Sequence, residues 1–578
     1  MSAGSSAPGA GADTVDVPVA APNGTYVGRR SHGVSEFLGI RYAGPALRWR
    51  SPRAPATTRD DVITAFSWGD SCVQPRDPVE LASLAPQSED CLTLNVWTRR
   101  VAHGGKPVMV FIHGGGGISG GSIDPLYRGR NLVSAVDDAE DVVVVTINYR
   151  LGVFGTLNLE GLPDFRDEYR DGLNLWLRDH QAALGWVQRN IAAFGGDPAN
   201  VTVLGQSAGA GFISTHLGIP ESRSLFARAI VQSGPLVNRQ VTLEQSRGTA
   251  ESVLGSLGLR TLDELLRAPA ETIVSRAIQG DGPAFGGAVF FPVTDGDFVP
   301  LDGFGAILAG HAKEIDLLVG TTDGERDAIV SPVRGETGNR AAPERVLQAI
   351  SRYESTVAGA ASALTVTDHP EVLASYLQQY EDETLGLVDL CNDINYRTGA
   401  ELMAEAQSLW NARTYGYLWS WAPSPERVLA ADPERGEVSP FGRALHCTEL
   451  PFVLRNADGM PSVTGPAESL PAGLADQASG AWLAFARTGI PSASGTPPWE
   501  PYRRGSRAIM RIDSEWTLEC DPRAATRRIL AALPLAARIA AAAGPSGSRG
   551  SRASAESRAS AGSRASADSP AARNTENG

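Results

Sequence analysis

The stretch Val201–Gly209 reads VTVLGQSAG and carries the strongest local signal in the chain. Its first four residues predict a short buried strand, and the residues from Ala210 onward predict a helix. Gly205 and Gly209 flank Ser207 in the GxSxG pattern of a tight strand-to-helix turn, which exposes the serine hydroxyl at the carboxyl end of a sheet. We therefore predict that Ser207 is a nucleophile; the alternative is a simple glycine-rich turn.

The segments around this turn alternate between strand and helix patterns. The near-continuous apolar runs favour strands covered on both faces of a largely parallel sheet; they lie at 107–113, 141–149, 227–232 and 315–320. Residues 179–194 have apolar positions at helical spacing and end before Gly195, a typical helix terminator. We predict an α/β fold with a large, mostly parallel twisted sheet flanked by helices. The regions 235–310 and 330–390 are expected to form a helical cap over the active site.

Composition excludes several classes of function. The 578 residues carry a formal charge of −14, which disfavours a nucleic-acid partner because phosphate binding depends on Lys and Arg. No apolar run is long enough to predict a membrane-spanning helix. The first residues, MSAGSSAPGAGADTVD, lack the basic start and apolar middle of a secretory signal, so a cytoplasmic location is expected. The five cysteines have no zinc-binding spacing, and we expect neither a metal nor an organic cofactor.

The two ends differ in composition from the rest. Residues 1–14 are rich in Gly, Ala and Ser, and residues 544–578 repeat SRASA without aromatic residues. Such segments cannot bury enough apolar surface to become ordered. We predict one catalytic domain over residues 15–543 between two disordered segments.

A glycine run precedes the nucleophile turn in the chain. The strand pattern at 107–113 leads into His113-Gly-Gly-Gly-Gly, which resembles the loop that supplies backbone N–H groups to an oxyanion hole. A further donor is expected from Ala208, the residue after the nucleophile. His113 itself is interpreted as structural, since the position of its backbone is what matters.

The catalytic base and acid are less certain from the residues alone. In hydrolases with a GxSxG nucleophile turn, the catalytic residues follow one another along the chain in the order Ser, then Asp or Glu, then His. Three histidines follow Ser207 with room for an acid between, namely His311, His369 and His446. The context of His446, in ALHCTELPFVL, favours it. Asp323 and Glu325 both follow the strand predicted at 315–320, and this pattern does not separate them.

Taken together, the motifs resemble the type-B carboxylesterase family, which includes para-nitrobenzyl esterases and cholinesterases. The resemblance covers about residues 15–540 and runs through ordered blocks: FLGIRYAGP at 37–45, SEDCLTLNVW at 88–97, VMVFIHGGG at 108–116, NYRLGVFG at 148–155, QRNIAAFGGDPANVTVLGQSAGA at 188–210, GTTDGE at 320–325, HCTELPFVL at 446–454 and WLAFARTGIP at 482–491.

The resemblance implies specific roles. It places the acid at Glu325 and the base at His446, and the oxyanion donors at Gly115, Gly116 and Ala208. It also implies a disulfide between Cys72 and Cys91, which a reducing cytosol would leave open. Ser233 resembles a family serine that supports the acid and base from behind; its alternative is an ordinary core serine.

Three positions depart from the family pattern. Gln206 stands where Glu is usual, which removes a carboxylate beside the nucleophile and weakens attraction for cationic substrates. Gly117 stands where a larger residue is common, which should widen the acyl side of the pocket, and His180 replaces a common Gln. Residues 73–90 contain no aromatic residue that could hold a quaternary ammonium group, so a choline ester is not expected.

The sequence therefore predicts a serine hydrolase that cleaves small-molecule carboxylic esters through an acyl-enzyme intermediate. The same triad could instead hydrolyse amides, carbamates or lactones, because all of these form the same oxyanion. A third hypothesis is a non-catalytic binding protein on this scaffold. The sequence leaves the natural substrate and the oligomeric state open.

Overall fold

A computed structural model describes residues 14–76, 81–101, 103–136, 141–234, 240–278, 290–330, 343–357, 365–431, 438–456, 461–466, 470–535 and 538. Disorder is predicted for residues 1–14 and 544–578. Apart from residue 14, these lie outside the described residues. The domain limits of 15 and 543 stay a prediction.

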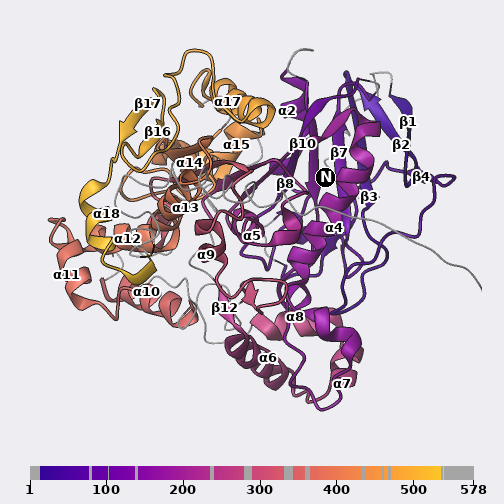
Figure 1. The fold of residues 1–578 in the computed structure, drawn as a ribbon, viewed down its shortest axis with the longest axis horizontal. Coiled ribbons are helices and arrows are strands. Elements are labelled where there is room, and N and C mark those ends of the chain that lie inside the picture. The colour runs from indigo at the N-terminus through magenta and orange to yellow at the C-terminus, as the bar shows by residue number, and fades with distance from the viewer. Residues whose placement is uncertain are drawn as a thin grey trace, which may run out of the picture.

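A large mixed sheet forms the centre of the described chain (Figure 1). Its middle is a run of parallel strands in the order β9 (Val143–Ile147), β8 (Lys106–Ile112), β10 (Gly196–Gln206), β11 (Arg228–Gln232), β14 (Asp316–Thr322), β15 (Thr414–Trp419) and β16 (Ala508–Ile512). Antiparallel strands extend both ends of this run: β1 (Val15–Ala21), β2 (Gly24–Ser31), β3 (Val34–Arg41) and β7 (Thr93–Thr98) beside β9, and β17 (Thr517–Cys520) beside β16. The predicted α/β class is confirmed; besides the parallel run in the middle, the short strand β4 (Val62–Thr64) pairs in parallel with β2 near one edge.

Both faces of the parallel run are buried, which explains its continuous apolar strands. Alternate residues of β8 enter different cores: Val108 and Val110 pack with helices α4 (Leu175–Asn190) and α5 (Ala208–His216). Met109 and Phe111 pack with α2 (Arg130–Ser134), α15 (Leu450–Val453) and α17 (Leu474–Thr488) on the other face. The sheet is thus sandwiched between two helical layers.

The regions expected to form a cap are mainly helical where they are described. The first contains α6 (Leu243–Leu257), α7 (Leu262–Arg267), α8 (Ala270–Ile278) and α9 (Gly303–Leu308). The second contains α10 (Pro343–Val357), α11 (Pro370–Leu377) and α12 (Glu383–Asn392). A π-helical turn, η7 (Asp393–Arg397), joins α12 to α13 (Thr398–Ser408). In Figure 1 α6, α7 and α8 lie at the bottom of the view, α9 lies near α5, and α10, α11 and α12 lie at the lower left.

Element boundaries differ in part from the sequence pattern. The helix predicted over 179–194 is observed as α4, four residues earlier, followed by a 3₁₀ turn that ends at Gly195 with a φ of 90°. Strand β10 starts at Gly196, five residues before the apolar run at Val201, because its first residue pairs with Lys106 of β8.

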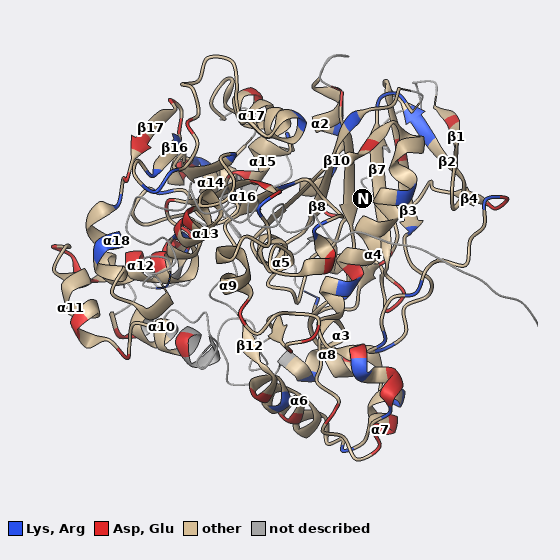
Figure 2. Ribbon diagram, viewed as in Figure 1, with Lys and Arg blue, Asp and Glu red and all other residues tan. Residues whose placement is uncertain are grey.

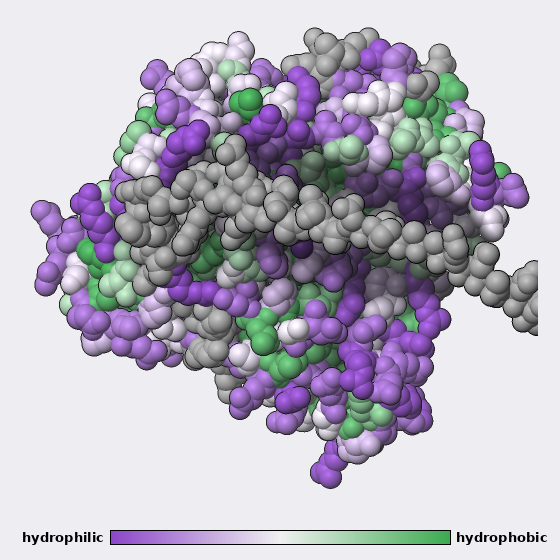
Figure 3. All heavy atoms as spheres, viewed as in Figure 1, coloured by the Kyte–Doolittle hydropathy of each residue, from purple (hydrophilic) through white to green (hydrophobic). Residues whose placement is uncertain are grey.

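Acidic and basic residues are interspersed over the described ribbon (Figure 2). The face in Figure 3 is mostly polar, with apolar patches near α11 and near β12 (Val241–Thr242). Within the described ranges, every helix is too short or too polar to cross a membrane.

Candidate active site

Ser207 stands in a strained turn between β10 and α5. Its φ of 54° and ψ of −126° are unusual for a residue with a side chain, and its N–H donates to the carbonyl of Gln232 at 2.9 Å. Such strain occurs at functional sites, where the surrounding structure holds it. The turn leaves Ser207 as the N-cap of α5, facing the pocket described below.

Close backbone packing explains the glycines of this turn. A Cβ on Gly209 would lie 2.1 Å from the carbonyl oxygen of Ile112, and one on Gly205 would lie 2.8 Å from the carbonyl carbon of Gly209. A Cβ on Gly234, from the end of the neighbouring strand, would lie 1.9 Å from the carbonyl oxygen of Ser207. Backbone atoms therefore pack closely against the Ser207 turn at all three glycines. The GxSxG pattern does not reveal that residue 234 must also be glycine.

The backbone N–H groups of the predicted oxyanion hole are free among the residues that the structure describes. Gly115 and Gly116 have φ values of 95° and 64°, which only glycine adopts readily. The N–H groups of Gly115, Gly116 and Ala208 donate to no acceptor in the described part of the chain. Gly116 and Ala208 line the same pocket as Ser207. These free donors suit an oxyanion, with the N-terminus of α5 adding a favourable dipole.

His446 and Glu325 form a close pair. The Nδ1 atom of His446 lies 2.5 Å from Oε2 of Glu325, whose side chain is fully buried. The other carboxylate oxygen of Glu325 accepts the N–H of Thr322 at 2.8 Å. Glu325 is thereby held on both oxygens, and it fixes a proton on Nδ1 of His446, which leaves Nε2 as the basic nitrogen.

The electrostatics of the pair stabilise a charged imidazole. Burial raises the pKa of Glu325, whereas interactions with His446, Ser233 and the Thr322 N–H lower it. The lowering effects are larger together, so the pKa of Glu325 lies below its usual value. Burial opposes the imidazolium of His446, yet Cys447, Tyr396 and Glu325 raise its pKa well above the usual value.

Of these neighbours, one carries charge near neutral pH. Burial raises the pKa of the Cys447 thiol, which therefore stays neutral at pH 7. The Glu325 carboxylate is therefore the charge that stabilises protonated His446 in neutral solution.

Ser207 and His446 share no hydrogen bond among the described residues. Instead, Nε2 of Gln206 lies 3.1 Å from Nε2 and 3.5 Å from Nδ1 of His446. The two distances are nearly equal. The amide nitrogen therefore does not lie along the lone pair of either ring nitrogen, because an atom in that position would be much farther from the other nitrogen. The Nε2 lone pair thus remains available, and apo hydrogen bonds of this kind commonly tighten on substrate binding.

A buried carboxylate ties the two triad loops together. We call residues 323–327 the acid loop and residues 439–446 the base loop. Asp327, fully buried in the acid loop, accepts bonds from Nε and Nη2 of Arg443 at 2.8 and 2.6 Å and from the Ser439 hydroxyl at 2.5 Å. Gly324 N–H donates to the carbonyl of Ala444 at 2.8 Å. The spacing between Glu325 and His446 is therefore fixed by direct contacts between their loops.

The alternative candidates lie elsewhere. Asp323 pairs with Arg511, with Oδ2 and Nη1 3.4 Å apart, and does not contact His446. His369 caps α11 and lies 3.6 Å from Glu371, while His311 follows α9. Ser233 Oγ is buried beside Glu325, but it has no hydrogen bond of suitable geometry among the described residues. Its role in supporting the acid stays a prediction.

The expected disulfide is not formed. Cys72 and Cys91 are both buried free thiols, and Cys72 Sγ accepts the Leu151 N–H at 3.2 Å. Contact with Cys72, together with burial, raises the pKa of the Cys91 thiol well above its usual value. The structure thus has the pair open, and the disulfide implied by the family resemblance stays a prediction.

An apolar pocket opens over Ser207, with an empty volume of about 420 Å³. Four aromatic rings contribute to its wall, those of Phe212, Phe290, Phe291 and Tyr396, and no charged side chain lines it among the described residues. Tyr396 also packs against His446, with ring centres 5.2 Å apart. Sequence patterns did not identify these rings because they come from a loop before β13 (Val293–Thr294), a π-helical turn and a buried helix face.

A buried histidine cluster, His113, His180 and His216, packs behind the oxyanion loop. His113 stacks on Tyr149 with ring centres 4.3 Å apart, and the Tyr149 hydroxyl donates to the His113 carbonyl at 2.8 Å. Nδ1 of His180 and Nε2 of His216 are 3.4 Å apart. Burial lowers the pKa values of all three, so the cluster is neutral and supports the loop through packing. Across the described residues, no group of His, Cys, Asp and Glu is arranged to hold a metal.

Comparisons with known proteins agree with this geometry. The model described as "Carboxylesterase family" matches residues 12–529. The chain is 34% identical over 523 residues to the para-nitrobenzyl esterase of Bacillus subtilis (strain 168), covering 88% of this chain and 97% of the relative. It is 30% identical to the phenmedipham hydrolase of Pseudarthrobacter oxydans, over 84% of this chain and 92% of that one.

Solved structures give the same result. A structure of a PNB esterase superposes with a TM-score of 0.73 at 32% identity, covering 89% of this chain and 99% of that chain. A carboxylesterase of Geobacillus stearothermophilus superposes with a TM-score of 0.73 at 30% identity and the same coverage.

Proposed function

Since this chain belongs to the carboxylesterase family and is a serine ester hydrolase, we propose that Ser207, His446 and Glu325 are its catalytic triad. The observation that carries this proposal is the 2.5 Å contact between His446 and Glu325 next to a strained serine. Gln206, bonded to Ser207 in the chain, lies against the same imidazole, which brings nucleophile and base into one neighbourhood.

The proposed reaction has two halves. His446 Nε2 takes the proton of the Ser207 hydroxyl as its oxygen attacks the ester carbonyl. The N–H groups of Gly115, Gly116 and Ala208 hold the resulting oxyanion, and the alcohol leaves with the proton from His446. Water then attacks the acyl-enzyme by the same steps and releases the acid. Glu325 stabilises the imidazolium in both halves and keeps its proton on Nδ1.

We propose that the substrates are neutral esters with apolar groups. The described lining of the pocket is aromatic and uncharged, so transfer of an apolar group from water is favourable there, whereas a charged group would lose its hydration without a partner. Gln206, which replaces the carboxylate usual in the family, supports the same preference. The cytoplasmic location expected from the sequence stays a prediction.

Burst kinetics test the assignment of the nucleophile. With p-nitrophenyl acetate, the wild-type chain should release a burst of p-nitrophenol equal to the enzyme concentration, and Ser207→Ala should release none. Ser214→Ala is the matched control, because its hydroxyl donates to the carbonyl of Gly211 within α5. A burst that survives in Ser207→Ala would refute the proposal.

Two further measurements separate the alternative functions. A fluorophosphonate probe should label the wild-type chain on Ser207, whereas a non-catalytic binding protein would not react. Matched ester and amide substrates, compared by kcat/KM, should favour the ester; faster cleavage of the amide would assign the triad to the other bond.

A further inference from the structure

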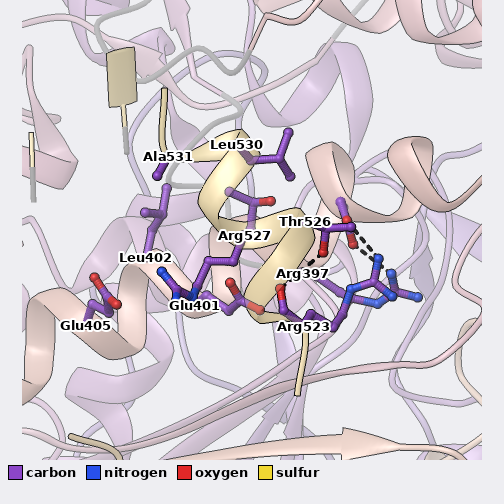
Figure 4. Close-up of a pocket in the computed structure, with 11 residues that line it drawn as sticks. Arg397, Glu401, Leu402, Glu405, Arg523, Thr526, Arg527, Leu530 and Ala531 are labelled. Atoms are coloured by element: carbon purple, nitrogen blue, oxygen red, sulfur yellow. Dashed lines mark hydrogen bonds and ion pairs between the residues drawn. The ribbon is translucent and has the colours of Figure 1, made fainter. Parts of the chain in front are cut away.

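A second pocket lies between α13 and α18 (Ala524–Leu530) and shares no lining residue with the pocket over Ser207. Its empty volume is about 510 Å³. Figure 4 shows Arg397 and Arg523 at one end of this pocket and Glu405 of α13 at the other. The lining includes as many acidic as basic side chains, so its charge favours neither an anion nor a cation as a ligand. The contacts of Arg523 lead instead toward the active site.

Arg523 is the N-cap residue of α18, and its guanidinium group reaches three oxygen atoms. Its Nη2 donates to Oδ2 of Asp393 at 3.0 Å. The same nitrogen donates to the hydroxyl oxygens of Tyr376 and Tyr380, at 3.3 and 3.4 Å. The Asp393 side chain is only 4% exposed, and charge-assisted hydrogen bonds to such a buried carboxylate are strong. Arg523 therefore holds Asp393 firmly in place.

Asp393 is the first residue of the π-helical turn η7. Its Oδ1 accepts from Arg397 at 2.7 Å, but this bond lies within the turn and connects it to no other element. Its Oδ2 accepts from the Tyr376 hydroxyl of α11 at 2.5 Å as well as from Arg523. Among the described residues, Arg523 is the one cation from another element that pairs with Asp393. Residues of α11 and α18 thus anchor the start of the turn.

The same turn supplies part of the catalytic wall. Tyr396 lines the pocket over Ser207, and its ring centre lies 5.2 Å from that of His446. Tyr396 follows Asp393 by three residues, and the turn is closed by the bond from the Thr398 N–H to the Asp393 carbonyl. A displacement of Asp393 should therefore displace Tyr396. Turns of this kind are rare, and they occur frequently at functional sites.

We propose that Arg523 is a positioning residue for ester hydrolysis: through Asp393 it fixes the π-helical turn, and it thereby holds the Tyr396 ring against the substrate and His446. This inference rests on the proposed function, in which His446 is the base. It adds a residue that does not itself line the pocket over Ser207 and that acts from the opposite side of the turn.

Kinetics of the full chain on p-nitrophenyl acetate test the proposal. Arg523→Ala should lower kcat/KM about tenfold, because even a small misplacement of a positioning group weakens the contacts made in the transition state. Arg527→Ala is the matched control. Both arginines line the second pocket and both side chains are 21% exposed, but Arg527 pairs with Asp521 and not with the turn. Its loss should leave kcat/KM nearly unchanged.

A double-mutant cycle determines whether Arg523 acts through Tyr396. When Tyr396→Ala is already present, Arg523→Ala should cause almost no further loss of kcat/KM, because the ring that it positions is gone. A merely structural role of Arg523 would multiply the two losses. Far-UV circular dichroism checks folding. If Arg523→Ala does not fold, Arg523→Lys replaces it in the cycle with a smaller expected loss, since lysine keeps the charge but lacks the planar fork.

Three results would overturn the proposal: unchanged kcat/KM in the folded Arg523 variant, equal losses in the two arginine variants, or losses that multiply in the double variant. The last would assign the effect to another route, such as the contacts of Asp389 with Arg523 and Arg443. A wrong triad assignment would appear separately, as a burst that survives in Ser207→Ala, because every variant of the cycle keeps Ser207.

Discussion

Asp327→Asn tests whether the contact between the acid loop and the base loop positions the triad. Asp327 is fully buried, and its two carboxylate oxygens accept from Arg443, Ser439 and, at 3.2 Å, from Asn392 of α12. Asparagine has nearly the same shape, but it replaces one acceptor oxygen by an NH₂ group and removes the charge.

The magnitude follows from these contacts. In either orientation the new NH₂ group faces a guanidinium nitrogen of Arg443, so at least one charge-assisted hydrogen bond is lost, worth about 1.5–3 kcal/mol. Removal of one partner from a buried ion pair costs about 3–5 kcal/mol. Arg443 keeps Asp389 as a second partner, so we expect the lower end, about 3 kcal/mol of unfolding free energy.

Two assays are needed. Urea unfolding followed by tryptophan fluorescence measures stability, and kcat/KM on p-nitrophenyl acetate measures the triad. Loosening the acid loop should misplace Glu325 relative to His446 and lower kcat/KM by about tenfold or more. Asp389→Asn is the matched control, since it also removes a carboxylate from Arg443 but lies on α12, outside both loops.

Both variants should lose stability, and Asp327→Asn should lose much more activity than Asp389→Asn. Equal losses of kcat/KM in the two variants would show that the loop contact has no special role in positioning the triad.

Further predictions concern the acid, the turn and the buried histidines. Glu325→Gln should lower kcat by about 10⁴-fold with little change in KM, measured at pH 7, because the imidazole loses its orientation and charge partner; a loss under tenfold would contradict this role. Gly234→Ala should reduce activity about 100-fold by displacing Ser207, while Gly248→Ala, with open space around its Cβ, should not. Burial lowers the pKa of His216 to about 3, below its value in the unfolded chain. As the pH falls, the unfolded chain therefore binds this proton before the folded chain does. The free energy of unfolding should then decrease by about 1.4 kcal/mol per pH unit below about pH 6.5. His216→Asn should flatten the profile of unfolding free energy between pH 4 and 6.5; an unchanged slope would refute this.

The central strands and the nucleophile turn were predictable because their signals are local. Buried parallel strands read as apolar runs, and the GxSxG turn has a fixed backbone. The antiparallel strands β1–β3 were not identified, since half-exposed strands such as Val15–Ala21 mix polar and apolar residues. Strand β15 also escaped notice because its residues, TYGYLW, are not an aliphatic run.

The site was predictable in its backbone groups and less so in its side-chain contacts. The residues alone left Asp323 and Glu325 open, and the family resemblance chose between them; their roles stay predictions. The Gln206–His446 contact, the Asp327 contacts and Gly234 depend on segments far apart in sequence, so no local pattern reports them. The Cys72–Cys91 disulfide stays a prediction, because the redox state of two buried thiols depends on their surroundings and not on a sequence pattern.

The π-helical turn Asp393–Arg397 has a consequence for helical phase. Asn395 and Tyr396 face the pocket over Ser207, whereas Arg397 and, further along α13, Glu401 face the second pocket. Each residue of an α-helix advances the direction by about 100°, so deletion of one residue in this turn would swing all of α13 by about that angle. Glu401 would then leave the second pocket at the same time as the catalytic wall lost its register, so a change in length here cannot alter one pocket alone.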